Sequence, residues 1–70
     1  MRRWTVCYRQ NKNTPLDVLF AATEEEADNF IDNLLDGFER ENINKIDQSA
    51  KGYYFEQGGM IEKRRHELNG

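Results

Sequence analysis

The chain has 70 residues, 37% hydrophobic and 33% charged, which fits one small globular domain over residues 1–70 and leaves no room for a second core. Its net charge of −3 argues against a general nucleic-acid binder. A single cysteine, Cys7, and a single histidine exclude an intrachain disulfide and a metal site with four cysteine or histidine ligands.

The apolar runs and the amino terminus bear on the cellular location. No run approaches the roughly 20 residues that a membrane span needs, so we expect no membrane contact. The amino terminus does not lead into the apolar segment of a signal peptide, and the thiol is unpaired, so we expect a cytoplasmic protein. A domain this small is often stabilised by a disulfide, a metal or self-association. Since the first two are not expected here, we predict a homodimer.

Two runs near the amino terminus alternate in side-chain character with period two, which is typical of half-buried strands. They are residues 3–10 and residues 16–22, and the turn-forming residues 11–15 between them predict a β-hairpin. We expect one side of this hairpin to meet the helix through the following residues: Trp4, Val6, Tyr8, Leu16, Val18 and Phe20.

An amphipathic helix is predicted from Thr23 to about Asn42. Thr23 and Glu26 fit a capping box, and the glutamates of the first turn suit the positive end of the helix dipole. Gly37 interrupts the helical pattern and leaves the last turn less certain than the first. The buried stripe, spaced at three and four residues, is Ala27, Phe30, Ile31, Leu34, Leu35 and Phe38.

The remainder of this helix is acidic, and residues 16–47 carry ten acidic residues against two basic ones. A solvated surface explains this pattern, but the acidic residues are also candidates for binding an unknown protein partner that is basic. They are Glu25, Asp28, Asp32, Asp36 and Glu39.

The second half of the chain predicts a further hairpin. Residues 43–47 are either a connection or a short strand, and the aromatic residues of 51–56 favour a strand. Gly58-Gly59 suits a tight turn, and residues 60–65 form the return strand, whose charges suit an exposed edge, although a terminal helix reaching Leu68 is the alternative. The order β-β-α-β-β predicts an α+β fold with an antiparallel sheet of three to four strands and the helix on one face.

Catalytic and metal-binding patterns are missing. Cys7 and His66 each occur once, and nothing near them in sequence supports an activated pair. Glu62 and His66 would be two metal ligands without a third, and Gly58-Gly59 is not followed by the Gly-Lys-Ser/Thr of a phosphate loop. We therefore predict a protein that is not an enzyme and binds no cofactor or metal.

The second face of the sheet is the expected dimer surface. If the helix covers one face, Cys7, Leu19 and Ala21 lie opposite, together with Tyr54 or with Tyr53 and Phe55. Uncovered apolar patches on small domains commonly mark association surfaces. The leading hypothesis is an interaction module that binds itself and a protein partner through this face or through the acidic helix.

Nucleic-acid binding is the alternative function. Lys63, Arg64 and Arg65 form a compact basic cluster, and the predicted hairpin brings Tyr53 and Tyr54 beside them. Aromatic residues that stack on bases beside cations that meet phosphates are typical of single-strand binders. The competing interpretation is that alternate aromatics pack the core and the basic residues protect an edge strand.

The strand-to-helix junction carries a resemblance. Residues 19–27, followed by Phe30 and Ile31, resemble the junction of many small phage and prophage proteins. They are also similar to the arm-binding amino-terminal domain of tyrosine integrases, which implies a three-stranded sheet with one helix. The basic strands of such a domain have no counterpart in residues 16–22, so the resemblance implies a fold and an origin rather than DNA binding.

Overall fold

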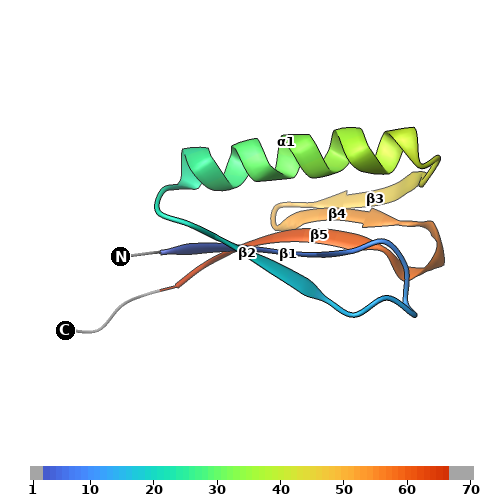
Figure 1. The fold of residues 1–70 in the computed structure, drawn as a ribbon, viewed down its shortest axis with the longest axis horizontal. Coiled ribbons are helices and arrows are strands. Elements are labelled where there is room, and N and C mark those ends of the chain that lie inside the picture. Colours follow the sequence, from blue (N-terminus) through green and yellow to red (C-terminus); the bar gives the residue numbers. More distant parts are fainter. Residues whose placement is uncertain (1–2, 67–70) are drawn as a thin grey trace.

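A computed structural model describes residues 3–66, which form one antiparallel sheet with a helix lying across one face (Figure 1). The strand order in the sheet is β2-β1-β5-β4-β3. The α+β class is confirmed, with five strands rather than three to four. The elements in chain order are β1 (Trp4–Arg9), β2 (Asp17–Ala21), α1 (Glu24–Arg40), β3 (Lys45–Ser49), β4 (Gly52–Phe55), a 3-10 turn (Glu56–Gly58) and β5 (Met60–Arg65).

The helix begins and ends close to where its capping residues predict. The Thr23 hydroxyl accepts a hydrogen bond from the Glu26 amide at 3.1 Å, which satisfies a backbone donor in the first turn. At the other end, Asn42 adopts a left-handed conformation with a φ of 59°, and the Ile43 amide donates to the Phe38 carbonyl at 2.9 Å. This is a Schellman motif: the helix ends at Arg40, two residues before the predicted Asn42, which is instead the left-handed residue after the cap.

The core lies between α1 and the sheet. Phe38 of the helix meets Phe55 of β4 in an edge-to-face contact, with ring centroids 4.8 Å apart. Val6 of β1 and Ile61 of β5 are fully buried beneath the helix. The buried cluster consists of Val6, Ala21, Ala27, Ile31, Phe38, Phe55 and Ile61.

The register of β1 against β2 overturns the predicted orientation of β2. Val6 lies opposite Leu19, and Trp4 lies opposite Ala21. Because opposite residues in an antiparallel pair project to the same side, Leu19 and Ala21 face the helix. The prediction failed because residues 16–22 are apolar on both sides, so alternation could not determine which side faces inward. The residues wrongly expected to face the helix are Leu16, Val18 and Phe20, which are 46%, 43% and 58% exposed.

The carboxyl-terminal strand is central, not the predicted edge. β5 pairs with β1 on one side and with β4 on the other. Its charged residues are tolerated there because they have partners: Lys63 is paired with the helix and Glu62 accepts from Tyr54. The alternative of a helix over 60–65 is wrong, and its continuation to Leu68 lies outside the described residues.

The second edge strand overlaps the ambiguous segment 43–47 and continues to Ser49. Residues 45–49 form β3, and an irregularity in register between Lys45 and Asp47 leaves Ile46 65% exposed. The turn before β5 is a 3-10 turn in which Gln57 and Gly58 have positive φ values of 64° and 84°. Among residues 3–66, no helix has the length and apolar character needed to cross a membrane.

Candidate functional site

The outer edge of β2 is the candidate site, and the hydrogen-bond pattern shows which backbone groups it presents. The His66 amide donates to the Arg3 carbonyl at 2.7 Å, so this carbonyl and the backbone groups of every second residue after Arg3 bond toward β5. The residues between them bond toward β2, and one of these residues is Val6, the partner of Leu19. Backbone groups alternate in direction along a strand, so those of Val18 and Phe20 point to the outer edge. Within residues 3–66, β1 is the one strand that pairs with β2.

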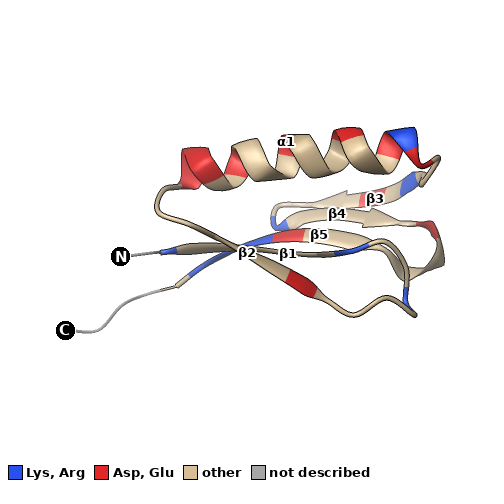
Figure 2. Cartoon of the chain, in the orientation of Figure 1, with Lys and Arg blue, Asp and Glu red and all other residues tan. Residues whose placement is uncertain are grey.

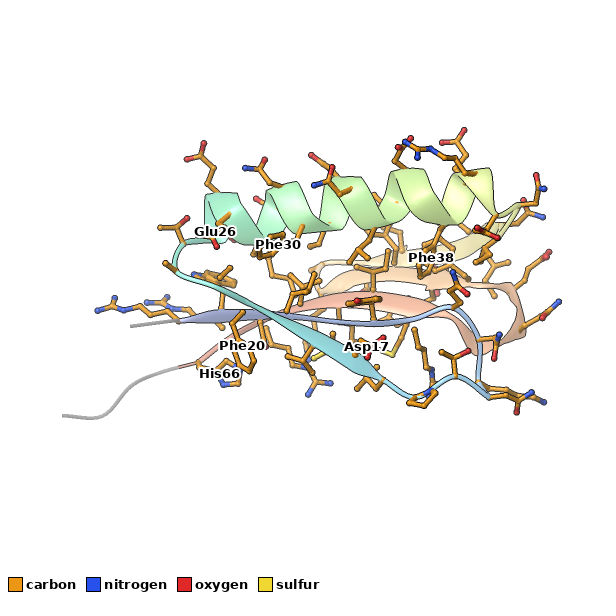
Figure 3. All side chains as sticks on the ribbon, viewed as in Figure 1. Asp17, Phe20, Glu26, Phe30, Phe38 and His66 are labelled. Atoms are coloured by element: carbon orange, nitrogen blue, oxygen red, sulfur yellow. The ribbon has the colours of Figure 1, made fainter. Side chains whose placement is uncertain are left out.

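Exposed apolar side chains accompany this edge. We call Leu16, Val18 and Phe20 the apolar stripe; each of them is more than two-fifths exposed. Figure 3 shows Phe20 on the side of the sheet away from α1, with His66 on the same side. The Oγ1 of Thr5, which lies opposite Phe20, is 2.9 Å from Nε2 of His66. The stripe thus borders a polar contact that connects β1 to the end of β5.

The centre of the same sheet face is polar. The Tyr54 hydroxyl donates to Oε2 of Glu62 at 2.7 Å, and Arg64 donates to Oε1 of Glu62 at 3.0 Å. The hydrogen bond from Tyr54 lowers the pKa of Glu62 most, and the bond and charge of Arg64 lower it further against the effect of burial. The face opposite the helix is therefore apolar along β2 and polar over β4 and β5.

The predicted dimer surface of Cys7, Leu19 and Ala21 is not brought together. Cys7 lies on the face away from the helix but is only 7% exposed, whereas Ala21 is fully buried under the helix and Leu19 is partly buried beside it. The exposed apolar residues of the strand are instead Val18 and Phe20. The sequence did contain a signal for them, since residues 16–22 have more apolar side chains than one covered face can use.

The two edges of the sheet differ in how they resist pairing with another strand. β3 carries Lys45 and Asp47 with a register irregularity between them, and such features are typical of protected edges. β2 pairs with β1 through five consecutive residues without a bulge, it has no lysine or proline, and its one charge, Asp17, is at its first position. β2 is therefore the unprotected edge.

The acidic helix residues are exposed as predicted, but they do not act alike. Figure 2 shows acidic residues along the whole length of α1. Asp28 pairs with Lys63 of β5, and Asp36 pairs with Arg40 one turn later in the helix. Glu24 also pairs with Lys63, and among residues 3–66 no ion pair is described for the exposed Glu25, Asp32 and Glu39. The predicted acidic surface is thus partly neutralised from within the chain.

The predicted basic and aromatic cluster is divided between the two faces of the sheet. Lys63 lies on the helix side, where Glu24 and Asp28 bind it at 3.0 and 2.8 Å. Arg65 lies opposite Trp4 in the register and so belongs to the same side. Successive residues of a strand point to opposite faces, so Arg64 is on the other side.

The two tyrosines are divided in the same way. Tyr54 and Arg64 both bond to Glu62 on the face away from the helix. Tyr53 is on the helix side, where the Lys45 ammonium lies 5.1 Å from its ring centroid. Strand alternation therefore separates residues that are adjacent in sequence, and the five predicted nucleic-acid contacts form no single surface.

A hollow of about 360 Å³, which no sequence pattern predicted, lies between the last turns of α1 and the β1–β2 turn. Its lining includes Tyr8, Arg9, Asp17 and Glu41, but no cysteine, serine or histidine. Within residues 3–66, no three histidine, cysteine, aspartate or glutamate residues are grouped so that they could hold a metal ion. The lining also includes Thr14, whose hydroxyl donates to Oδ1 of Asn11 at 3.1 Å, so the hollow offers charged and hydrogen-bonding groups.

No protein-family model, no curated protein and no solved structure matches this chain. The candidate site therefore rests on its geometry alone.

Proposed function

We propose that the protein is a non-enzymatic interaction module that binds a polypeptide by strand addition along the outer edge of β2. The observation that carries this proposal is the contrast between the two edges, because β2 lacks the lysine and the register irregularity that protect β3. In strand addition, main-chain hydrogen bonds supply affinity and alternate side chains supply specificity.

The apolar stripe supplies the second element that such a site needs. The outward backbone groups belong to Val18 and Phe20, whose side chains are exposed. The alternate side chains of an added strand would therefore contact the side chains of these two residues. The polar group of Tyr54, Glu62 and Arg64 sets the limit of the apolar surface. A bound polypeptide therefore lies along β2 rather than across the whole face.

Site-specific photo-cross-linking in the native cell tests the proposal. A benzoylphenylalanine replaces Phe20 on the β2 edge, and in a matched control it replaces Ile46 on the β3 edge, since both residues are more than half exposed. We expect a discrete adduct from position 20 and none from position 46. Val18→Lys added to the position-20 protein should abolish the adduct. Equal labelling from the two positions, or none from either, would overturn the proposal.

The nucleic-acid alternative receives less support from the arrangement of side chains. Lys63 and Arg64 point to opposite faces, and each is bonded to a carboxylate of the same chain. The acidic helix residues offer charge for a basic partner, but the large apolar side chains that are exposed among residues 3–66 lie outside α1, and such anchors dominate binding energy. Strand addition at β2 combines backbone groups with apolar anchors, and for that reason we favour it.

A further inference from the structure

We infer that the polypeptide that fits the β2 edge is a second copy of this chain, paired antiparallel through β2 about a two-fold axis at Leu19. This inference rests on the proposed function of β2, and it adds the identity of the partner and the register. The two strands would join their sheets into one continuous sheet of ten strands, with both helices on the same side.

The register follows from the position of Leu19 at the centre of β2. With the axis there, all five residues of β2 meet the five of the second copy, and Val18 lies opposite Phe20 of that copy. Val18 and Phe20 are the residues whose backbone groups point outward, so they form the hydrogen-bonded pairs. Leu19 meets its own copy in a non-hydrogen-bonded pair, in which side chains are closest.

The side chains are also complementary in this register. Each Val18 lies beside the Phe20 ring of the other copy, which is a favoured pairing of a β-branched and an aromatic residue. Asp17 lies opposite Ala21 of the second copy, so like charges do not meet. An axis at Phe20 would leave Asp17 beyond the end of the opposing strand, and an axis at Val18 would place its carboxylate against Leu19.

Pairing β2 with β2 of a second copy suits this edge better than pairing β2 of one copy with β3 of the next. The register irregularity of β3 disrupts the ladder that such a contact would need. Repeated head-to-tail contacts would also build an open filament, whereas pairing β2 with β2 closes after two chains. The two-fold arrangement uses the unprotected edge of each copy and leaves the protected edges outside.

The mass in solution tests self-pairing. Light scattering and sedimentation should give twice the 8.3 kDa of one chain for the natural protein and for an Ile46→Lys control, and a single chain for Val18→Lys. Val18 and Ile46 are both exposed, and circular dichroism should show that both variants fold. In the natural protein, the Val18 amide should exchange hydrogen more slowly as the concentration rises. A monomer at every concentration would overturn the inference.

A cysteine at the axis tests the register. In a Cys7→Ser background, Leu19→Cys should form a disulfide with its own copy under mild oxidation, because Cα atoms in such pairs are about 4.5 Å apart. The control Ile46→Cys should stay reduced. A dimer by mass that fails to cross-link at position 19 would overturn the register.

A monomer whose position-20 photo-adduct contains a different protein would overturn self-pairing and leave the proposed function standing, whereas a monomer without any adduct would overturn both.

Discussion

Lys63 of β5 donates a 2.8 Å hydrogen bond to Asp28 of α1 and so joins two residues that are 35 positions apart in sequence. The same ammonium donates to Glu24 at 3.0 Å and lies 5.5 Å from the centroid of the Trp4 ring. The Lys63 side chain is 20% exposed, whereas the two carboxylates are more than half exposed. This group of charges attaches the first turns of the helix to the centre of the sheet.

Replacing Lys63 should loosen that attachment. We expect Lys63→Met to lower the free energy of unfolding by about 1 kcal/mol, because it removes two partly exposed ion pairs but keeps most of the side-chain packing. Asp28→Asn should have a smaller effect in the same direction. Asp32→Asn, one turn further along the exposed surface, is the matched control and should leave urea denaturation unchanged.

The pH dependence of the Lys63 effect has a defined sign. Asp28, followed by Glu24, raises the pKa of Lys63 above its usual 10.5 in the folded protein. The stabilisation is therefore fully present below pH 10.5 and is lost as the pH rises through the higher folded value. The difference in stability between the natural protein and Lys63→Met should shrink in that range, and a difference that persisted at higher pH would contradict this assignment.

Tyr54→Phe should change the acid limb of the stability curve. The Tyr54 hydroxyl is the main reason that the pKa of Glu62 lies below its usual 4.5, so its removal should raise that pKa, as carboxyl chemical shifts can measure. Because the folded pKa is lowered, the stabilisation is present above pH 4.5 and lost as the pH falls through the folded value. We expect a loss of about 1–2 kcal/mol near neutral pH.

The matched control for that experiment is the neighbouring tyrosine. Tyr53→Phe removes a hydroxyl on the helix side of the sheet, away from Glu62. It should leave both the pKa of Glu62 and the acid limb unchanged. Equal effects of the two substitutions would show that the hydroxyl of Tyr54 is not the cause.

Two glycines should respond to alanine in opposite directions. A Cβ at Gly37 would meet nothing within 4 Å, so Gly37→Ala should stabilise the protein by about 0.5–1 kcal/mol through helix propensity. A Cβ at Gly52 would collide with the Ile61 carbonyl oxygen and lie 2.9 Å from the Glu62 Cα, both on the central strand. Gly52→Ala should therefore cost about 3 kcal/mol, and thermal unfolding can compare the two variants.

The helix start offers a local prediction. Thr23→Ala removes the acceptor for the Glu26 amide and should lower the free energy of unfolding by about 1 kcal/mol. Thr23→Ser keeps the hydroxyl and should restore most of that loss. A serine variant as unstable as the alanine variant would indicate that the threonine methyl, rather than the cap, is responsible.

The helix was predictable from sequence because its signals are local. Thr23 and Glu26 lie within one turn of each other, and the apolar spacing from Ala27 to Phe38 follows from helical periodicity alone. The same holds for Asn42, whose left-handed conformation ends the helix. The direction of β1 was also predictable, since Trp4, Val6 and Tyr8 alternate with more polar residues.

The candidate site depended on long-range pairing that sequence does not encode locally. Alternation in residues 16–22 was compatible with either face, and the pairing of Val6 with Leu19 decided that Val18 and Phe20 face outward. The insertion of β5 between β1 and β4 left β2 at one edge and β3 at the other. The sequence by itself determined the helix, the first two strands and the aromatic strand β4, because capping and periodicity act over a few residues. Only the tertiary structure decided which edge is exposed and which side chains border it, because strand order and register depend on contacts between residues far apart in the chain.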